Sequence, residues 1–328
     1  MKHNLKEKRI LVIGGAGFIG AFVVRELLKH PVKEVIIYDN FTRGKEENIK
    51  DSLKDERCSV FPYGGDVRDI DILDKAFEGV DYVFHLAAMW LLHCKDFPRT
   101  AFEVNIAGTF NVLEACVKHN VKKLIYSSSA SVYGDAIEVP MTEDHPFNNK
   151  NFYGSTKIAG EAMCTAFNDR YDLEVIGLRY MNVFGAGQDQ HAVYTGVVPI
   201  MLNKIEANEA PVINGDGSQA YDFIYVEDVA RANVSALLSE IKLGFYNVGT
   251  EVQTSIRELC DTILRLKKSN LKVQYKPYSE DDARQLVQNR IGSAKKAKEE
   301  IGFQYKYNLE QGLQALIDWR VKEGIDKG

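Results

Sequence analysis

The feature that most constrains the fold is a regular alternation of short apolar runs with amphipathic segments over roughly the first half of the chain. The apolar runs are rich in β-branched and aromatic residues and nearly continuous in hydrophobicity, as strands buried on both faces of a sheet should be. They read RILVIGG, EVIIYDN, CSVFPYGGD, VDYVFHLAA, VKKLIYSSS and LEVIGLRYMNV. The segments between them read FIGAFVVRELLKH, DIDILDKAFEG, TAFEVNIAGTFNVLEACVKHN and STKIAGEAMCTAFNDRY, with helical periodicity. This order predicts an α/β fold with a doubly wound parallel sheet and helices on both faces.

The alternation loosens after about residue 180, where GVVPIMLNKIEANE, SIRELCDTILRLKK and LEQGLQALIDWRVKE are helical in pattern and APVINGDG indicates a short strand and a turn. We expect residues 1–180 to form the parallel-sheet domain. Residues of about 222–250, which include a further strand FYNVG, are expected to return to it. Residues 181–328 are then mostly a smaller, partly interwoven α/β lobe, and a chain of 328 residues is long enough for this arrangement.

Composition excludes several classes of protein. The net charge of -5 does not favour nucleic-acid binding, and no run approaches the roughly 18 apolar residues of a membrane span. The N-terminal MKHNLKEKRI is charged and leads directly into a strand, unlike a signal peptide. Five scattered cysteines without CxxC spacing indicate buried thiols in a reducing cytoplasm, and no zinc motif is present. We therefore expect a cytoplasmic protein with neither a nucleic-acid partner nor a membrane partner.

A glycine-rich turn, IGGAGFIG, joins the first strand to the first helix. In this context Gly14 allows the tight turn, Gly17 lets backbone amides approach a pyrophosphate, and Gly20 lets the helix pack closely on the strand. The helix N-terminus then offers free N–H groups and the positive end of its dipole to phosphate oxygens. The pattern predicts a dinucleotide-binding site.

The end of the second strand, IIYDN, indicates which dinucleotide is bound. Asp39, followed by Asn40, is placed to accept hydrogen bonds from both ribose hydroxyls, and its carboxylate would repel a 2′-phosphate. NAD is therefore favoured over NADP, although Arg43 lies nearby. Asp66 and Val67 after the third strand are candidates for contact with the adenine, with a plain turn as the alternative.

The segment NFYGSTK places Tyr153 and Lys157 one helical turn apart on the same face. A free tyrosine has a pKa of about 10, and a nearby cation favours the phenolate. The Lys157 ammonium and an oxidised nicotinamide together would lower the pKa of Tyr153 enough for the phenolate to take a proton from a sugar hydroxyl while a hydride leaves to NAD. Ser129, at the end of the fifth strand, can hydrogen-bond the same oxygen.

With these residues the chain resembles the extended short-chain dehydrogenase/reductases, and within them the NAD-dependent nucleotide-sugar epimerases and dehydratases. The resemblance runs nearly end to end and includes GGAGFIG, HLAA, EVNIAGT, SSSASVYG, YGSTK, RYMNVFG and GDGSQAYDFIYVEDVA. It implies a Rossmann domain, a tightly held NAD, a C-terminal lobe for the sugar nucleotide, and Ser129, Tyr153 and Lys157 as the catalytic set. It also implies a homodimer formed by the helices that contain TAFEVNIAGTFNVLEACVKHN and STKIAGEAMCTAFNDRY. The expected cofactor contacts, besides those named, are Phe18, Ile19, Leu86, Ala87, Ala88, Asn105, Ser127 and Tyr180.

Two positions indicate the reaction within this family. The resemblance implies an adjacent Asp-Glu pair in the 4,6-dehydratases, and a Glu at the second position in the sugar-acid decarboxylases. Here the two positions are Ala130 and Ser131, and neither residue can do that acid–base work. The remaining set fits a UDP-hexose 4-epimerase that oxidises C4 transiently. The alternatives are another NAD-dependent nucleotide-sugar enzyme (a dehydratase, a decarboxylase or a C4 oxidoreductase) and a non-catalytic NAD-binding scaffold.

The expected substrate contacts include two departures from the family pattern. Tyr221 stands where the family has an arginine for the diphosphate, and Arg284, with Arg290 nearby, is the candidate replacement. After HLAA the run is bulky and apolar from Met89 to Leu92, which indicates either core packing of a displaced loop or a reshaped sugar pocket. The other expected substrate contacts are Ser129, Ser131, Asn182, Val198 and Pro199.

Overall fold

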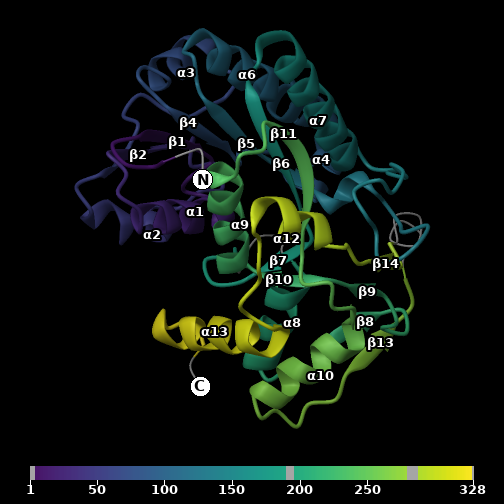
Figure 1. The fold of residues 1–328 in the computed structure, drawn as a ribbon. Coiled ribbons are helices and arrows are strands. Elements are labelled where there is room, and N and C mark those ends of the chain that lie inside the picture. The colour runs from purple at the N-terminus through teal and green to yellow at the C-terminus, as the bar shows by residue number, and fades with distance from the viewer. Residues whose placement is uncertain (1–3, 190–195, 279–286, 327–328) are drawn as a thin grey trace.

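A parallel sheet forms the centre of the computed structural model, which describes residues 4–189, 196–278 and 287–326 (Figure 1). Within those residues the sheet has seven strands in the order β11-β6-β5-β4-β1-β2-β3. Each neighbouring pair is parallel, and most strand residues are buried because helices cover both faces. The bounds are β1 Arg9–Ile13, β2 Glu34–Tyr38, β3 Cys58–Val60, β4 Tyr82–His85, β5 Lys123–Ser129, β6 Glu174–Tyr180 and β11 Leu243–Val248.

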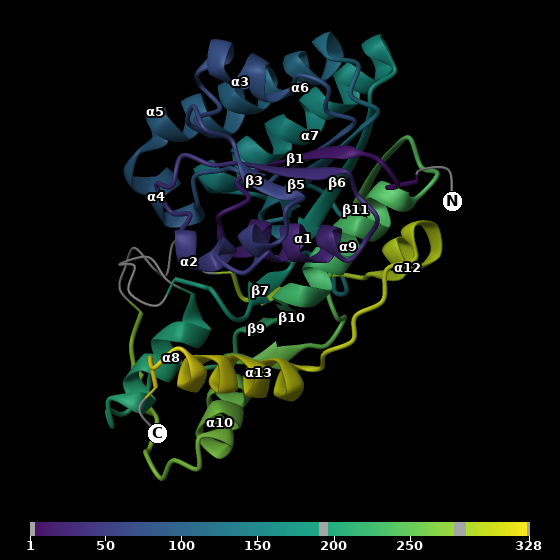
Figure 2. The same ribbon diagram turned by 90° about the vertical axis from the view of Figure 1, so that its left-hand side faces the viewer.

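Helices pack on the two faces in separate apolar clusters (Figure 2). One cluster joins alternate residues of β1, such as Ile10 and Val12, to α1 (Phe18–Leu28) and α9 (Val226–Leu238). The other joins Leu11 and Ile13 to α3 (Ile70–Ala76), α6 (Gly108–Lys118) and α7 (Phe152–Tyr171). The twofold alternation of strand side chains thus divides one apolar run between two cores.

The second half adds helices and short strands beyond the carboxyl ends of the sheet strands (Figure 2). Strand β9 (Ala220–Tyr221) lies between β12 (Thr254–Ser255) and β14 (Asn289–Arg290), and β10 (Phe223–Tyr225) pairs with β7 (Asn182–Phe184). Strand β8 (Val212–Asn214) pairs with β13 (Gln274–Lys276). The helices are α8 Val197–Glu206, α10 Ile256–Leu266, α12 Lys295–Ile301 and α13 Leu309–Lys322, and the short helices of the first half are α2 Glu46–Ile49, η1 Ser52–Lys54, α4 Leu91–Asp96, α5 Pro98–Ala101 and η3 Ala130–Val132.

The sequence-based elements agree with this fold except at two places. FYNVG is part of β11, which pairs with β6 and extends the sheet as predicted. LEVIGLRYMNV, predicted as one strand, is divided at Met181 between β6 of the main sheet and β7 of a second sheet. The helix predicted over TAFEVNIAGTFNVLEACVKHN contains a π-helical turn, η2 (Phe102–Ala107), before α6 begins.

The state of the cysteines agrees with the expectation from composition. All five cysteines are buried and free, as the sequence indicates. Among the described residues, no helix is both long and apolar enough to cross a bilayer.

The strand order changes direction at β1, because the chain continues from β1 to β2 on one side and crosses to β4 on the other. In open parallel sheets such a point leaves a crevice at the carboxyl ends of the strands, where ligands bind. The glycine turn follows β1, and the serine run ends β5. The topology therefore brings both predicted motifs to one edge of the sheet.

Candidate active site

A cleft over the carboxyl edge of the sheet collects most of the predicted site residues. Its lining joins the glycine turn and the ends of β4 and β5 to α7, and it continues to α8 and β14 in the second half. The predicted residues that line it are Gly14, Gly17, Phe18, Ile19, Gly20, Leu86, Ala88, Ser127, Ser129, Ser131, Tyr153, Lys157, Tyr180, Asn182 and Val198. Segments far apart in the sequence thus contribute to a single site.

Some predicted residues do not line this cleft, and one is outside the described residues. Those that do not line it are Asp39, Asn40, Asp66, Val67, Ala87, Asn105, Pro199 and Tyr221. Asp66 pairs with Arg68 at 2.7 Å, while Val67 is buried and its carbonyl accepts from the Asn111 side chain. Arg284 belongs to residues 279–286, outside the part of the chain that the structure describes.

The glycine turn has the close contacts that its predicted roles require. Gly14 has a φ of +82°, and a Cβ on it would lie 2.6 Å from the backbone nitrogen of Ala87. A Cβ on Gly20 would lie 2.1 Å from the Gly14 carbonyl oxygen, so only glycine lets α1 begin this close to β1. The first turn of α1 has no side-chain cap, which leaves its N–H groups available to phosphate oxygens. This cradle fits the pyrophosphate of a dinucleotide.

Asp39 holds the glycine turn from the neighbouring strand. Its carboxylate accepts from the N–H of Ala16 and from the N–H of Phe41, both at 2.9 Å. Burial raises the pKa of Asp39, and these backbone hydrogen bonds oppose the shift. A carboxylate has about four acceptor positions, so Asp39 can still accept from ribose hydroxyls, as the sequence predicts for NAD.

The predicted catalytic residues converge at the end of β5 and the first turns of α7. Asn151 caps α7 by accepting from the N–H of Gly154 at 2.8 Å, which fixes where the helix begins and how it presents Tyr153. Lys157 donates to the carbonyl oxygen of Ser127 at 2.7 Å, and its Nζ lies 5.7 Å from the centre of the Tyr153 ring. Burial lowers the pKa of Lys157 to about 8.

In the chain without its cofactor, Tyr153 is a weak acid. Burial raises the pKa of Tyr153, and Ser129 and Arg290 act against this shift without overcoming it. The cost of removing a phenolate from water dominates here, whereas the sequence-based prediction concerns Tyr153 beside a bound oxidised nicotinamide and stays a prediction. The phenol of the chain without its cofactor is therefore neutral at physiological pH.

Asn105 supports the cleft from the π-helical turn η2 and does not line it. Its Oδ1 accepts from the N–H of Met89 at 2.7 Å, and its Nδ2 donates to the Met89 carbonyl oxygen and to Thr156 Oγ1, both at 3.1 Å. The side chain thus ties the segment after β4 to α7. Met89, Trp90 and Leu91 line the cleft, which favours the interpretation of this segment as part of a reshaped pocket.

Several residues that line the cleft were not predicted to contact NAD or the substrate, and among them are Trp90, Arg43 and Arg290. Trp90 lies under the guanidinium of Arg43, whose carbon is 5.3 Å from the ring centre, and both residues line the cleft. Arg290 also lines it, whereas its partner across the β14–β9 pair, Tyr221, donates its hydroxyl to the Val287 carbonyl oxygen at 2.8 Å. Tyr221 therefore does not replace the family arginine at the cleft.

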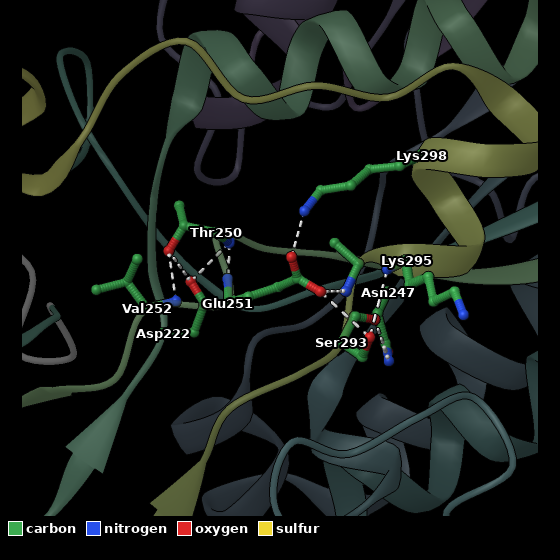
Figure 3. Close-up of polar contacts among 9 residues, drawn as sticks. Asp222, Asn247, Thr250, Glu251, Val252, Ser293, Lys295 and Lys298 are labelled. Atoms are coloured by element: carbon green, nitrogen blue, oxygen red, sulfur yellow. Dashed lines mark hydrogen bonds and ion pairs between the residues drawn. The ribbon is translucent and has the colours of Figure 1, made fainter.

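A buried polar network holds the second half against the end of β11 (Figure 3). Asp222 accepts from the N–H and hydroxyl of Thr250 and from the N–H of Glu251, at 2.7–2.9 Å. Glu251 in turn accepts from the N–H of Ala294 at 2.9 Å and pairs with Lys298. Asp222 also donates its N–H to the Arg290 carbonyl oxygen at 3.1 Å. The network fixes the position of β14 relative to the sheet.

Comparisons with known proteins show the family to which the chain belongs. Residues 10–249 match the model of the NAD dependent epimerase/dehydratase family. The chain is 32% identical to a UDP-glucose 4-epimerase of Halalkalibacterium halodurans, over 94% of this chain and 95% of that protein.

Two solved structures are similar over nearly their whole length. One is a UDP-N-acetylglucosamine 4-epimerase from Methanobrevibacter ruminantium in complex with UDP-N-acetylmuramic acid, with a TM-score of 0.90, 32% identity, and 97% of this chain and 99% of that chain covered. The other is a UDP-glucose 4-epimerase of Thermus thermophilus in complex with NAD, with a TM-score of 0.83, 30% identity, and 95% and 99% covered. With a Rossmann sheet, a dinucleotide cradle after β1 and this match over most of its length, the chain belongs to the NAD-dependent epimerase/dehydratase family of nucleotide-sugar enzymes.

Proposed function

We propose that the chain is an NAD-dependent UDP-sugar 4-epimerase in which Ser129, Tyr153 and Lys157 form the catalytic set. The observation that carries the proposal is that these three side chains line the same cleft as the dinucleotide cradle. Ala130 and Ser131 stand where acid–base residues for elimination would be needed, and Ser131 lines the cleft without offering such a group.

When bound, NAD supplies a hydride acceptor for C4 of the sugar and a hydride donor for the return step. The phenolate form of Tyr153 would take the proton from O4 during oxidation, and the resulting phenol would give it back during reduction. Ser129 faces this hydroxyl and lowers the pKa of Tyr153. Lys157, held by the Ser127 carbonyl, keeps a cation one helical turn away.

The raised pKa of Tyr153 gives the positive charge of the oxidised nicotinamide a specific role in this proposal. Burial favours the protonated phenol in the chain without cofactor. A bound oxidised nicotinamide would bring a positive charge that favours the phenolate of Tyr153, so ionisation of Tyr153 and cofactor binding would be coupled.

The shape of the cleft supports a nucleotide sugar as the substrate. Asn182 and the first residues of α8, which has no side-chain cap and begins at Val197, line the cleft together with the glycine turn. Free N–H groups at a helix N-terminus favour phosphate oxygens, and the sequence predicts a diphosphate contact at Asn182 and a substrate contact at Val198. The sugar then lies between this contact and Tyr153.

The experiment that tests the proposal is turnover of UDP-glucose, UDP-galactose and their uronic-acid and N-acetyl counterparts, followed by proton NMR. We expect a 4-epimer to appear without added cofactor and NAD to be released when the protein is denatured. Tyr153→Phe should abolish turnover, whereas Tyr275→Phe, on the exposed strand β13, should not change it. Full activity of Tyr153→Phe would refute the mechanism.

Product mass separates the remaining possibilities. A 4-epimer has the mass of its substrate, whereas a dehydratase product has lost water, a decarboxylase product has lost carbon dioxide, and a C4 oxidoreductase product differs by two hydrogens. A non-catalytic scaffold would bind NAD and exchange no label at C4. Any of these results in place of an isobaric product would replace the proposed reaction.

We also propose a homodimer formed through α6 and α7, which lie side by side on the outside of the sheet (Figure 1). Large apolar side chains are exposed along this surface, with Phe102 at 48%, Phe110 at 41% and Tyr171 at 52% of their full accessibility. Apolar groups exposed together in this way are typical of a surface that another chain covers.

A further inference from the structure

The guanidinium of Arg290 is a charged group in the cleft that has no partner among the described residues. Its Nε is buried and makes no hydrogen bond, and no ion pair of its side chain is present in residues 4–189, 196–278 and 287–326. The backbone position is fixed, because the Arg290 carbonyl oxygen accepts from the Asp222 N–H at 3.1 Å and β14 pairs with β9. The side chain therefore projects from a firmly held strand into the cleft.

The neighbours of Arg290 do not neutralise it. Burial lowers the pKa of Arg290, and the groups that oppose this shift are Tyr221, Asp135 and Tyr153. Two of these are phenols, and the Tyr221 hydroxyl is bonded to the Val287 carbonyl. The Asp135 carboxylate accepts from the N–H groups of Gln288 and Asn289 at 2.8 and 3.1 Å and makes no ion pair with Arg290.

A guanidinium in such a position is costly unless an anion completes it. Arginine does not lose its proton in proteins, so it cannot escape the cost of burial by becoming neutral. A charge that is partly withdrawn from water and has no ion pair is destabilising. Among the described residues no carboxylate pairs with Arg290, and its side chain lines the cleft that Tyr153 also lines, where an anion of a bound substrate can reach it.

The position of Arg290 indicates which part of the substrate carries that anion. The Arg290 charge acts on Tyr153, so it lies towards the reacting end of the sugar. The diphosphate has a separate candidate site at Asn182 and the uncapped N-terminus of α8. In a pyranose the anomeric carbon, which carries the diphosphate, is across the ring from C4, whereas C5 and its substituent are adjacent to C4.

We propose that Arg290 binds a carboxylate on the sugar ring next to the reacting carbon, so that the preferred substrate is a nucleotide-linked uronic acid. A carboxylate is planar and accepts two parallel N–H groups from a guanidinium, which gives recognition as well as affinity. A neutral hexose offers only a hydroxyl at the same position and leaves the guanidinium incompletely paired. The inference rests on the proposed function for the identity of the reacting carbon.

The test compares a uronic acid with the matching neutral hexose by binding, so that it does not depend on turnover. NAD-loaded Tyr153→Phe protein is titrated calorimetrically with UDP-glucuronic acid and with UDP-glucose, alone and combined with Arg290→Gln or Arg290→Lys. Arg265→Gln, whose side chain pairs with exposed Glu310 on α13, is the matched control. Circular dichroism melts show whether each variant is folded.

We expect UDP-glucuronic acid to bind more tightly than UDP-glucose. Arg290→Gln should lower the affinity for UDP-glucuronic acid by about 10- to 100-fold, the range for a hydrogen bond between charged groups. The same variant should change UDP-glucose affinity by less than about threefold on the same scale. Arg290→Lys keeps the charge without the planar fork and should retain part of the difference. Arg265→Gln should change the affinity for neither ligand.

An equal loss for both ligands would overturn the proposal, because it would place the guanidinium on the diphosphate that they share. Equal affinities for the two ligands of the protein in which Arg290 is unchanged would overturn the proposal as well. If the binding difference appears and no 4-epimer of either sugar is produced by the wild-type protein, the proposed reaction fails while the carboxylate site stands.

Discussion

Replacing Lys157 by methionine should stabilise the protein without its cofactor while removing its activity. Lys157 is 3% exposed, and burial lowers its pKa from 10.5 to about 8. Methionine is similar in length and flexible enough to fill the same space, and it carries no charge. The substitution therefore removes the penalty of holding an ammonium in the interior.

The magnitude follows from the pKa shift. A shift of about 2.5 units corresponds to roughly 3.4 kcal/mol. The lost hydrogen bond to the Ser127 carbonyl, 2.7 Å long, offsets this gain. With about 1.5 kcal/mol for that bond, the net gain at pH 7 is about 2 kcal/mol. For a chain of 328 residues this corresponds to a rise in Tm of roughly 3 °C.

The pH dependence identifies the cause. Because the folded-state pKa of Lys157 is below its unfolded value, the wild-type chain carries the penalty in full below pH 8 and loses it as the pH rises towards 10.5. The advantage of Lys157→Met should therefore be largest at pH 7 and vanish by about pH 10.

The assay is urea unfolding of NAD-free protein, followed by circular dichroism at pH 7 to 10. Lys33→Met, at an exposed lysine, is the matched control and should show no such trend. A Lys157→Met variant that is less stable than wild type at pH 7, or whose advantage does not depend on pH, would refute the reasoning.

Three further predictions concern the cradle, the polar network and the proposed dimer. Gly20→Ala should destabilise the fold by about 1–3 kcal/mol, because α1 must move away from the Gly14 carbonyl oxygen. In Gly17→Ala the new Cβ would lie 3.2 Å from the same oxygen, so this variant should keep most of the stability and bind NAD more weakly. Thermal melts with and without NAD would contradict this if both variants lost equal stability. Burial raises the pKa of Asp222 to about 6, so its contribution to stability is present at low pH and is lost as the pH rises through 6. Asp222→Asn should therefore show a flatter dependence of unfolding free energy on pH between 4 and 7, and parallel curves in chemical denaturation would rule this out. Phe110→Glu should shift the protein to a monomer in analytical ultracentrifugation with NAD still bound, and an unchanged sedimentation coefficient would count against α6 and α7 as the interface.

The central sheet was predictable because its strands are buried on both faces. That burial requires nearly continuous apolar runs, and such runs are visible without any tertiary information. The strands of the second half lack this signal. β9 and β14 are two residues each and are extended because they pair with each other, which no local pattern reveals.

The candidate site was predictable where a motif carries its own geometry. The glycine turn and the Tyr153–Lys157 spacing fall into this group, because one turn or one helix determines the relation between the residues. The importance of Arg290 depends on its strand partner Tyr221 and on the lack of a counterion, and both are tertiary facts. The extent to which burial raises the pKa of Tyr153 in the chain without its cofactor could not be predicted from sequence, because desolvation depends on the whole surrounding fold.

The short strands around β9 have a consequence for how this enzyme can change. Ser129, Tyr153 and Lys157 reach the cleft from one compact stretch of chain, β5 to α7, whereas Arg290 reaches it from β14, a distant stretch anchored by Asp222 and Glu251. A side chain on β14 can be exchanged while those anchors keep the backbone in place. Under the proposed function, selection could therefore alter which sugar is accepted at this position and leave the proposed catalytic residues untouched.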